Sequence, residues 1–266
     1  MDKIVVITGA SAGIGLATAK LFAENGDKVY DLSRRGTDKF NSIKCDITDK
    51  KSVDDAFAHI FETEGRIDVL INNAGMGISG ATENTSDEDM RRIFEVNFFG
   101  AIYCIQTVTN YMRIGGGGMI INISSAAAKV ALPFQSFYSA TKSAFCSVSD
   151  SLRAELAAFN IKVTSILPGD VKTEFTQSRV KNISDDPIYG EAIRKSVETM
   201  EKDEINGMSP NVIANIAYKL ANKKNPPPYV VGGFQYKALL FFVKLLPAKL
   251  VVSVIGKMYG GQSKSK

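Results

Sequence analysis

The chain begins with a short apolar run that leads into a glycine-rich turn, and this combination restricts the fold more than any other feature. Residues 3–8 read Lys-Ile-Val-Val-Ile-Thr, a β-branched pattern typical of a strand buried on both faces of a parallel sheet. The turn Gly9-Ala-Ser-Ala-Gly13-Ile-Gly15 follows at once, and residues 16–24 have the pattern of a helix. This order predicts an anion site, because glycines let the backbone approach a pyrophosphate and the helix N-terminus directs free N–H groups toward it.

A tyrosine and a lysine stand four residues apart in Tyr138-Ser-Ala-Thr-Lys142. On a helix this spacing puts a phenol and an ammonium on one face. A phenol with its ordinary pKa of about 10 is a poor acid–base catalyst at neutral pH, and a neighbouring cation lowers that pKa. The spacing also occurs by chance on solvated helix faces. Together with the glycine turn, however, it indicates a nucleotide-dependent redox enzyme.

Four further motifs follow in a fixed order along the chain. They are Asn72-Asn-Ala-Gly75 after the apolar run at 69–71, Asn97 in a helical stretch, Ser125 at the end of the strand pattern 119–124, and Pro168-Gly-Asp-Val-Lys-Thr173 after the run 162–167. With the turn and the Tyr–Lys pair, they resemble the short-chain dehydrogenase/reductase family, whose motifs are Thr-Gly-x-x-x-Gly-x-Gly and Tyr-x-x-x-Lys. The resemblance extends over about residues 3–233.

Strand and helix patterns alternate along the chain, which predicts an α/β fold. We expect one domain with a Rossmann-like, doubly wound parallel sheet and helices on both faces. Residues 1–233 are expected to form the catalytic domain, with a substrate lid at about 174–209. Residues 234–266 form a basic, apolar C-terminal extension.

The resemblance implies four catalytic residues. Tyr138 would protonate the forming alkoxide or take a proton in the reverse oxidation, and Lys142 would lower the tyrosine pKa and hold the nicotinamide ribose. Ser125 would donate a hydrogen bond to the substrate oxygen as charge develops on it. Asn97 would hold a water molecule that passes protons to Lys142. The nicotinamide itself performs the hydride transfer.

The end of the second predicted strand, residues 28–33, bears on the choice between NAD and NADP. An NAD site carries an acidic residue there for the ribose 2′-hydroxyl, whereas an NADP site carries an arginine for the 2′-phosphate. By the family's spacing the acidic position falls on Ser33, so Asp31 comes two residues too early. Ser33 with Arg34, assisted by Arg35, therefore resembles an NADP(H) site, and NADP(H) is favoured over NAD(H).

The remaining cofactor contacts implied by the resemblance come from each βα connection. They are Gly9, Ser11, Ala12, Gly13, Ile14 and Gly15 in the turn, Asp46 and Ile47 after the third strand, Asn73, Ala74 and Gly75 after the fourth, Tyr138 and Lys142 in the active site, and Pro168, Gly169, Val171 and Thr173 in the later loop. Ala12 departs from many NADP-preferring relatives, which carry a basic residue at this position. Asp46 has a second interpretation as the cap of the helix that starts near Lys50, a role that Asp49 could also fill.

The single histidine, His59, and the three cysteines do not assemble into a zinc pattern, so no metal is expected. Cys45, Cys104 and Cys146 lie in or beside apolar stretches, as reduced cysteines of a cytoplasmic protein do. The first residues are a strand rather than a leader, so secretion is not expected. No nucleic-acid partner is expected, and the family resemblance implies a homodimer or homotetramer.

The region from Ile205 to Lys266 contains nine lysines and no acidic residue, and its apolar runs are too short and too often interrupted to span a membrane. Three interpretations stay open for the extension. It lies on an anionic membrane surface, or it covers the substrate cleft or a subunit interface, or it packs on the core.

The residues around the predicted catalytic centre are mostly apolar, so an apolar carbonyl or secondary alcohol is the expected substrate. They are Met76, Ile78, Ala127, Val130, Leu132, Phe134 and Phe137, and the predicted lid adds Phe175, Val180, Ile183, Ile188, Tyr189 and Met200. The resemblance favours a hydroxysteroid-like or lipid substrate. A 3-oxoacyl-thioester reductase and a non-catalytic NADP-binding redox sensor are the alternatives.

Overall fold

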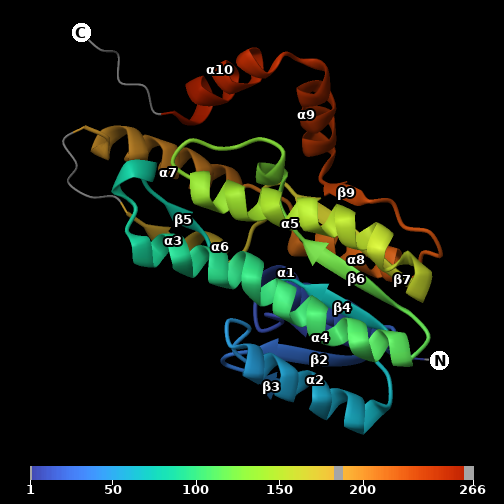
Figure 1. Ribbon diagram of the computed structural model, residues 1–266. Helices are drawn as coiled ribbons and strands as arrows, with labels where there is room; N and C mark the ends of the chain where they lie inside the picture. The colour runs from blue at the N-terminus through green and yellow to red at the C-terminus, as the bar shows by residue number, and fades with distance from the viewer. Residues whose placement is uncertain (1, 183–187, 261–266) are drawn as a thin grey trace.

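The computed structural model describes residues 2–182 and 188–260 (Figure 1). Within these residues a seven-stranded sheet has the order β3-β2-β1-β4-β6-β7-β9, and all of its neighbouring strands are parallel. The strands are β1 (Ile4–Thr8), β2 (Lys28–Ser33), β3 (Asn41–Lys44), β4 (Val69–Asn72), β6 (Gly118–Ile123), β7 (Ile161–Pro168) and β9 (Tyr229–Gly232). The predicted doubly wound parallel sheet is confirmed.

Helices cover both faces of this sheet (Figure 1). One face carries α1 (Gly13–Glu24) and α8 (Pro210–Ala221), and the other carries α2 (Lys50–Glu64), α4 (Gly100–Ile114) and α5 (Ser136–Glu155). Helix α3 (Asp87–Phe94) continues through a π-helical turn, Glu95–Phe99, into α4. Short 3₁₀ turns lie at Thr82–Asn84, Ala126–Ala128 and Ala157–Phe159.

The first strand shows why the sheet is buried on both faces. Side chains alternate along a strand, so Val5 and Ile7 pack with Phe22 of α1, whereas Ile4 and Val6 pack with Phe57 of α2. Both faces therefore need apolar residues, which explains the uninterrupted run in the sequence.

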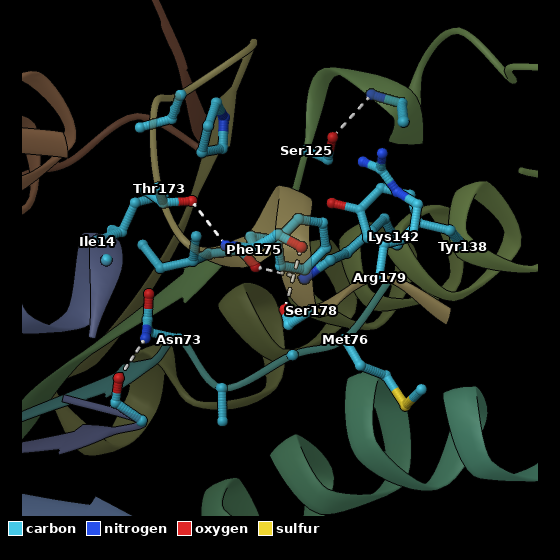
Figure 2. A pocket seen from close by; sticks show the side chains of 18 of the residues that line it. Ile14, Asn73, Met76, Ser125, Tyr138, Lys142, Thr173, Phe175, Ser178 and Arg179 are labelled. Carbon is cyan, nitrogen blue, oxygen red and sulfur yellow. Dashed lines mark hydrogen bonds between the residues drawn. The ribbon is translucent and has the colours of Figure 1, made fainter. Parts of the chain in front are cut away.

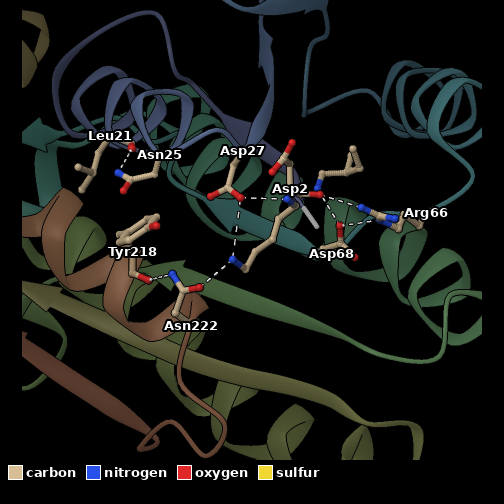
Figure 3. A network of polar contacts seen from close by, with 10 residues as sticks. Asp2, Leu21, Asn25, Asp27, Arg66, Asp68, Tyr218 and Asn222 are labelled. Carbon is tan, nitrogen blue, oxygen red and sulfur yellow. Dashed lines mark hydrogen bonds and ion pairs between the residues drawn. The ribbon is translucent and has the colours of Figure 1, made fainter.

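A polar network fixes the amino-terminal edge of the sheet (Figure 3). Asp27 accepts from the backbone N–H of Lys3 at 2.9 Å, and Asp68 accepts from the backbone N–H of Ile4 at 2.7 Å. The Nζ atom of Lys3 also donates to Asn222 after α8, at 2.7 Å. These contacts hold the start of β1 at the edge opposite the glycine turn.

The remaining elements lie near the carboxyl edge of the sheet. They are a two-stranded parallel ladder of β5 (Ile78–Ser79) and β8 (Val180–Lys181), and the helices α6 (Phe175–Ser178), α7 (Gly190–Ile205), α9 (Phe234–Leu245) and α10 (Ala248–Tyr259). Figure 1 shows α9 rising from the end of β9 and α10 turning back above α7. Of the helices in the described part of the chain, none is both long and apolar enough to cross a membrane.

Candidate active site

A cavity of about 1270 Å³ opens at the carboxyl edge of the sheet. Residues that follow β1, β2, β4, β6 and β7 line it, as expected for a parallel sheet whose ligands bind beyond the carboxyl ends of the strands. Its volume exceeds the roughly 300–1,000 Å³ usual for a single ligand. The cavity therefore has room for a dinucleotide and a substrate together.

The glycine turn is built for close approach of backbone to backbone. Gly9 and Gly13 have φ angles of 70° and 53°, which side-chain-bearing residues rarely adopt. Gly15 lies directly against the carbonyl of Gly9. Asn73, at the end of β4, donates through Nδ2 to the carbonyl oxygens of Thr8 and Gly9 at 3.0 and 3.1 Å. The turn thus has a fixed shape, and Gly13 and Ile14 at the start of α1 line the cavity. A helix N-terminus in this position can bind a pyrophosphate through its free N–H groups.

The end of β2 presents two arginines to the same cavity. Arg34 and Arg35 are exposed and line the cavity beside Ser33. Asp31 is fully buried instead, where it accepts from the backbone N–H of Ala10 at 2.9 Å and from the hydroxyl of Ser33 at 2.7 Å. Its carboxylate therefore holds the glycine turn through a hydrogen bond from the buried side, and Asp31 is not among the residues that line the cavity.

The structure distinguishes between the two interpretations of Asp46. Asp49 is the N-cap of α2 and accepts from the backbone N–H of Lys51 at 2.9 Å. Asp46 accepts from the backbone and hydroxyl of Thr48 at 3.0 and 2.8 Å, and it lines the cavity together with Ile47. Asp46 is therefore free of the capping role.

Tyr138 and Ser125 meet at the inner end of the cavity (Figure 2). Ser125 follows β6 and accepts from the backbone N–H of Ala127 at 3.1 Å, which fixes its side chain. Burial raises the pKa of the Tyr138 phenol, and a hydrogen bond with Ser125 opposes this shift. The predicted lowering of the tyrosine pKa is thus not found in the protein by itself, because desolvation outweighs the other effects.

Lys142 lies one helical turn after Tyr138 in α5, with Nζ 5.9 Å from the centre of the Tyr138 ring. The ammonium is buried and donates to the carbonyl oxygen of Ile123 at 3.0 Å. Burial lowers its pKa to about 8. The lysine is therefore held at the end of β6.

Asn97 lies in the π-helical turn between α3 and α4, a distortion often found at functional sites. Its side chain is buried, accepts from the backbone N–H of Met76 at 2.7 Å and donates to the Met76 carbonyl at 2.9 Å. A methyl group added to Gly75 would lie 3.3 Å from Asn97 Oδ1 and 3.7 Å from Lys142 Nζ. Asn97 and Lys142 therefore approach the same glycine from two helices.

A sequence profile of the short chain dehydrogenase family matches residues 3–184. The chain belongs to the short-chain dehydrogenase/reductase family. It is 40% identical over 232 residues to a protein named 3-ketodihydrosphingosine reductase from Bacteroides thetaiotaomicron, covering 85% of this chain and 86% of that one. A short-chain dehydrogenase from Streptomyces avermitilis superposes with a TM-score of 0.82 at 28% identity, covering 97% of both chains. A 3-ketoacyl-(acyl-carrier-protein) reductase from Brucella melitensis, solved with NADH, gives a TM-score of 0.73 at 26% identity over 87% of this chain and 97% of that one.

In this short-chain dehydrogenase/reductase, all but two of the predicted site residues line the one cavity. The exceptions are Gly15, which lies behind the turn, and Asn97, which lies behind Met76. The prediction for the apolar wall was less accurate, since Ile78, Phe134 and Phe137 are not among the lining residues. Ile78 pairs with Val180 in the small ladder, and Ile183 lies outside the described residues.

Sequence reasoning missed a polar group beside Tyr138. Asp170, Arg179, Glu204 and Tyr236 all line the cavity. Asp170 lies inside the Pro168–Thr173 motif and could have been singled out there. The pairing of Arg179 with Glu204 brings β8 and α7 together across 25 positions, so no local pattern could have indicated it.

The C-terminal helices of this dehydrogenase/reductase close one side of the cavity. Tyr236 and Leu239 of α9 line it, as do four residues of α10, namely Val254, Ile255, Met258 and Tyr259. The hydroxyl of Tyr236 donates to Asp170, and that of Tyr259 donates to Asp203 of α7 at 3.0 Å. Of the three interpretations of the extension, the structure supports a cover of the cavity, and Leu240 and Ile255 also pack in a buried apolar cluster with Val130 and Leu167.

Proposed function

We propose that the protein is an NADPH-dependent reductase of a ketone on a long-chain lipid, with 3-ketodihydrosphingosine as the first candidate substrate. The observation that carries this proposal is the cavity itself, which joins Tyr138 and Ser125 to an apolar wall supplied by α9 and α10. The name of the Bacteroides relative supports the same substrate class. The sequence analysis favoured a hydroxysteroid-like or lipid substrate, and the hydroxysteroid draws no such support.

The residues of the chain suit the proton chemistry of a ketone reduction. A bound nicotinamide would supply hydride to the carbonyl carbon. Ser125 would polarise the carbonyl oxygen, and Tyr138 would deliver its proton to that oxygen. Because burial raises the pKa of Tyr138, the phenol keeps its proton at neutral pH and is ready to act as an acid. Lys142 would hold the ribose, and Asn97, anchored on Met76, would hold a proton-relay water.

The test is a panel of ketones followed by nicotinamide absorbance with purified protein, including 3-ketodihydrosphingosine, a 3-oxoacyl thioester and a ketosteroid. We expect reduction of the sphingoid ketone, and Tyr138→Phe should lower its kcat by about 10²–10⁴-fold with NADPH affinity unchanged. The resemblance to the Brucella enzyme makes the 3-oxoacyl thioester the second candidate. A chain that binds NADPH tightly but reduces none of these ketones would instead fit the redox-sensor alternative.

The preference for NADPH is proposed from the charge at the end of β2. Arg34 and Arg35 are exposed there, and the carboxylate of the same strand, Asp31, is buried beneath the turn. Replacing both arginines by alanine should raise the KM for NADPH at least tenfold and should leave the KM for NADH unchanged. A tenfold change corresponds to roughly the free energy of one charge-assisted hydrogen bond. Lys39→Ala, which removes an exposed cation away from the cavity, is the matched control. Equal effects on both cofactors would contradict the preference.

The exposed surface of α9 and α10 is proposed to contact an anionic membrane surface. Its exposed apolar side chains are Phe234, Leu239, Phe241, Phe242, Leu245, Leu246, Leu250, Val252, Val254 and Met258, and its exposed lysines are Lys237, Lys244, Lys249 and Lys257. Three of these side chains, Leu239, Val254 and Met258, also line the cavity. An apolar path therefore leads from this face to the catalytic end, which suits a lipid substrate.

Vesicle sedimentation tests the membrane contact. The protein should sediment with vesicles containing phosphatidylglycerol, less so with pure phosphatidylcholine and less at high salt. Serine at both Phe241 and Phe242 should abolish sedimentation, whereas Phe159→Ser, an exposed apolar residue elsewhere, should not. Light scattering is the companion measurement, because α9 and α10 could instead hold a homodimer or homotetramer together. Such an oligomer would dissociate in the double variant, and that result would exclude the membrane as the partner of this surface.

A further inference from the structure

A buried arginine lies beside the proposed proton donor. Arg179 follows α6 and directly precedes β8, and its side chain is only 1% exposed. It donates through Nη2 to Glu204 of α7, whose other carboxylate oxygen accepts from the Thr176 hydroxyl at 2.6 Å. Figure 2 shows Arg179, Lys142 and Tyr138 gathered in one part of the cavity.

Two donors of this arginine are left over. No acceptor in the described part of the chain lies within hydrogen-bonding distance of Nε or Nη1, although both are buried. Leaving such groups without a partner is costly, so their presence in a native structure requires an explanation. Arg179 also lines the cavity, so a small movement of its side chain on ligand binding would bring these two N–H groups to a substrate oxygen.

Two carboxylates share the cavity with this arginine. Glu204 and Asp170 both line the cavity, and their charges act together to raise the pKa of Tyr138, while Arg179 acts in the opposite direction. Asp170 is held by the Tyr236 hydroxyl from α9. An ionised carboxylate offers about four acceptor sites, so Glu204 keeps acceptor capacity beyond Arg179 and Thr176. A ligand that complements this group carries a positive charge together with a hydroxyl or carbonyl oxygen.

We propose that Arg179, Glu204 and Asp170 form a head-group subsite for a ketone that carries a protonated amine and a hydroxyl beside the carbonyl. The two free N–H groups of Arg179 donate to the hydroxyl oxygen, and the carboxylates accept from the ammonium. This inference rests on the proposed ketone reduction and specifies its substrate as an amino ketone. An acyl thioester has no cation to offer these carboxylates.

The experiment compares two ketones of equal chain length, 3-ketodihydrosphingosine and the 1-hydroxy-3-ketone in which hydrogen replaces the amine. The wild type should show a KM at least about tenfold lower for the amino ketone, the scale of one hydrogen bond to a charged group. Glu204→Gln, which keeps the shape and removes the charge, should raise only the KM for the amino ketone. Because the charge of Glu204 also raises the pKa of Tyr138, any change in kcat should be the same for both ketones.

Asp170→Asn is the second variant and should shift the same KM in the same direction, which keeps the test decisive if Glu204→Gln does not fold. The matched control is Glu201→Gln, because Glu201 pairs with Lys181 across the same β8–α7 contact but is not among the cavity residues. Melting temperature and NADPH affinity are measured for every variant.

With a merely structural ion pair, the variants would change the KM for both ketones alike, and that result would overturn the subsite. Equal KM values for the two ketones in the wild type would also overturn it while leaving the proposed ketone reduction intact. If the wild type reduces neither ketone, the proposed function fails and the subsite fails with it.

Discussion

Replacing Gly15 by alanine is expected to weaken dinucleotide binding and to destabilise the fold, because the turn has no room for a methyl group. The added Cβ would lie 2.5 Å from Asn73 Nδ2 and 2.9 Å from the carbonyl carbon of Gly9, and closer still to the Gly9 carbonyl oxygen. Ordinary van der Waals contact begins at 3.4 Å. The turn and the end of β4 must therefore separate by about 1 Å, a shift that breaks close packing.

The magnitude follows from the two groups that must move. Overpacking of this kind costs about 1–3 kcal/mol, and the Asn73 hydrogen bond to Gly9 is worth about 1 kcal/mol more. A chain of this size should lose about 2–4 °C of melting temperature for each kcal/mol. Displaced N–H groups at the start of α1 should raise the Kd of the dinucleotide by about tenfold or more, the equivalent of one charge-assisted hydrogen bond.

The assay is fluorescence titration with the dinucleotide that the wild type prefers, together with thermal unfolding. Gly256→Ala in α10 is the matched control, since no described atom lies within 4 Å of its added Cβ. This variant should keep wild-type affinity and gain up to about 1 kcal/mol from the lower entropy of the unfolded chain. If Gly15→Ala binds the dinucleotide within twofold of the wild type and melts at the same temperature, the steric reasoning is refuted.

Three further predictions concern stability and reactivity. Asp49→Ala removes the cap of α2 and should cost about 1 kcal/mol of unfolding free energy, with dinucleotide affinity unchanged in the same titration. The folded protein holds the pKa of Lys142 near 8, below the unfolded value of 10.5. Between these pH values the unfolded chain thus binds more protons than the folded chain. Lys142→Met should raise the unfolding free energy, and this gain should shrink by up to about 1.4 kcal/mol per pH unit from pH 8 to 10. A constant difference in chemical denaturation would contradict this. Burial raises the pKa of Cys104, and Cys45 and Cys146 are also buried. Iodoacetamide should therefore label the native protein slowly and the denatured protein at three sites, as counted by mass spectrometry.

The fold was predictable because its signals are local. The apolar run of β1, the glycine turn and the start of α1 are consecutive in the sequence, and strands and helices alternate along most of the chain. In a parallel sheet the carboxyl ends of the strands meet at one edge. The sequence therefore predicts that residues after β1, β4 and β6 lie close together, and they line one cavity.

Other features were out of reach because they depend on contacts between distant segments. The π-helical turn at Asn97 interrupts what the sequence presents as an ordinary helix. The predicted apolar wall included Phe134, which instead adopts a φ of 59° and packs against Tyr189. No periodic pattern in the sequence predicts these features, because they depend on how several elements pack together in the folded protein.

The sequence by itself determined the order of strands and helices, the shape of the turn and the identity of the residues at the strand ends, because these follow from steric preference and side-chain periodicity. Only the tertiary structure decided the electrostatics of the site. Burial raises the pKa of Tyr138, whereas the Tyr-x-x-x-Lys spacing alone predicted a lowering. Folding also pairs Arg179 with Glu204, which lies 25 residues away in the sequence. Desolvation and charge pairing are properties of the assembled interior, so they exist only once the chain has folded.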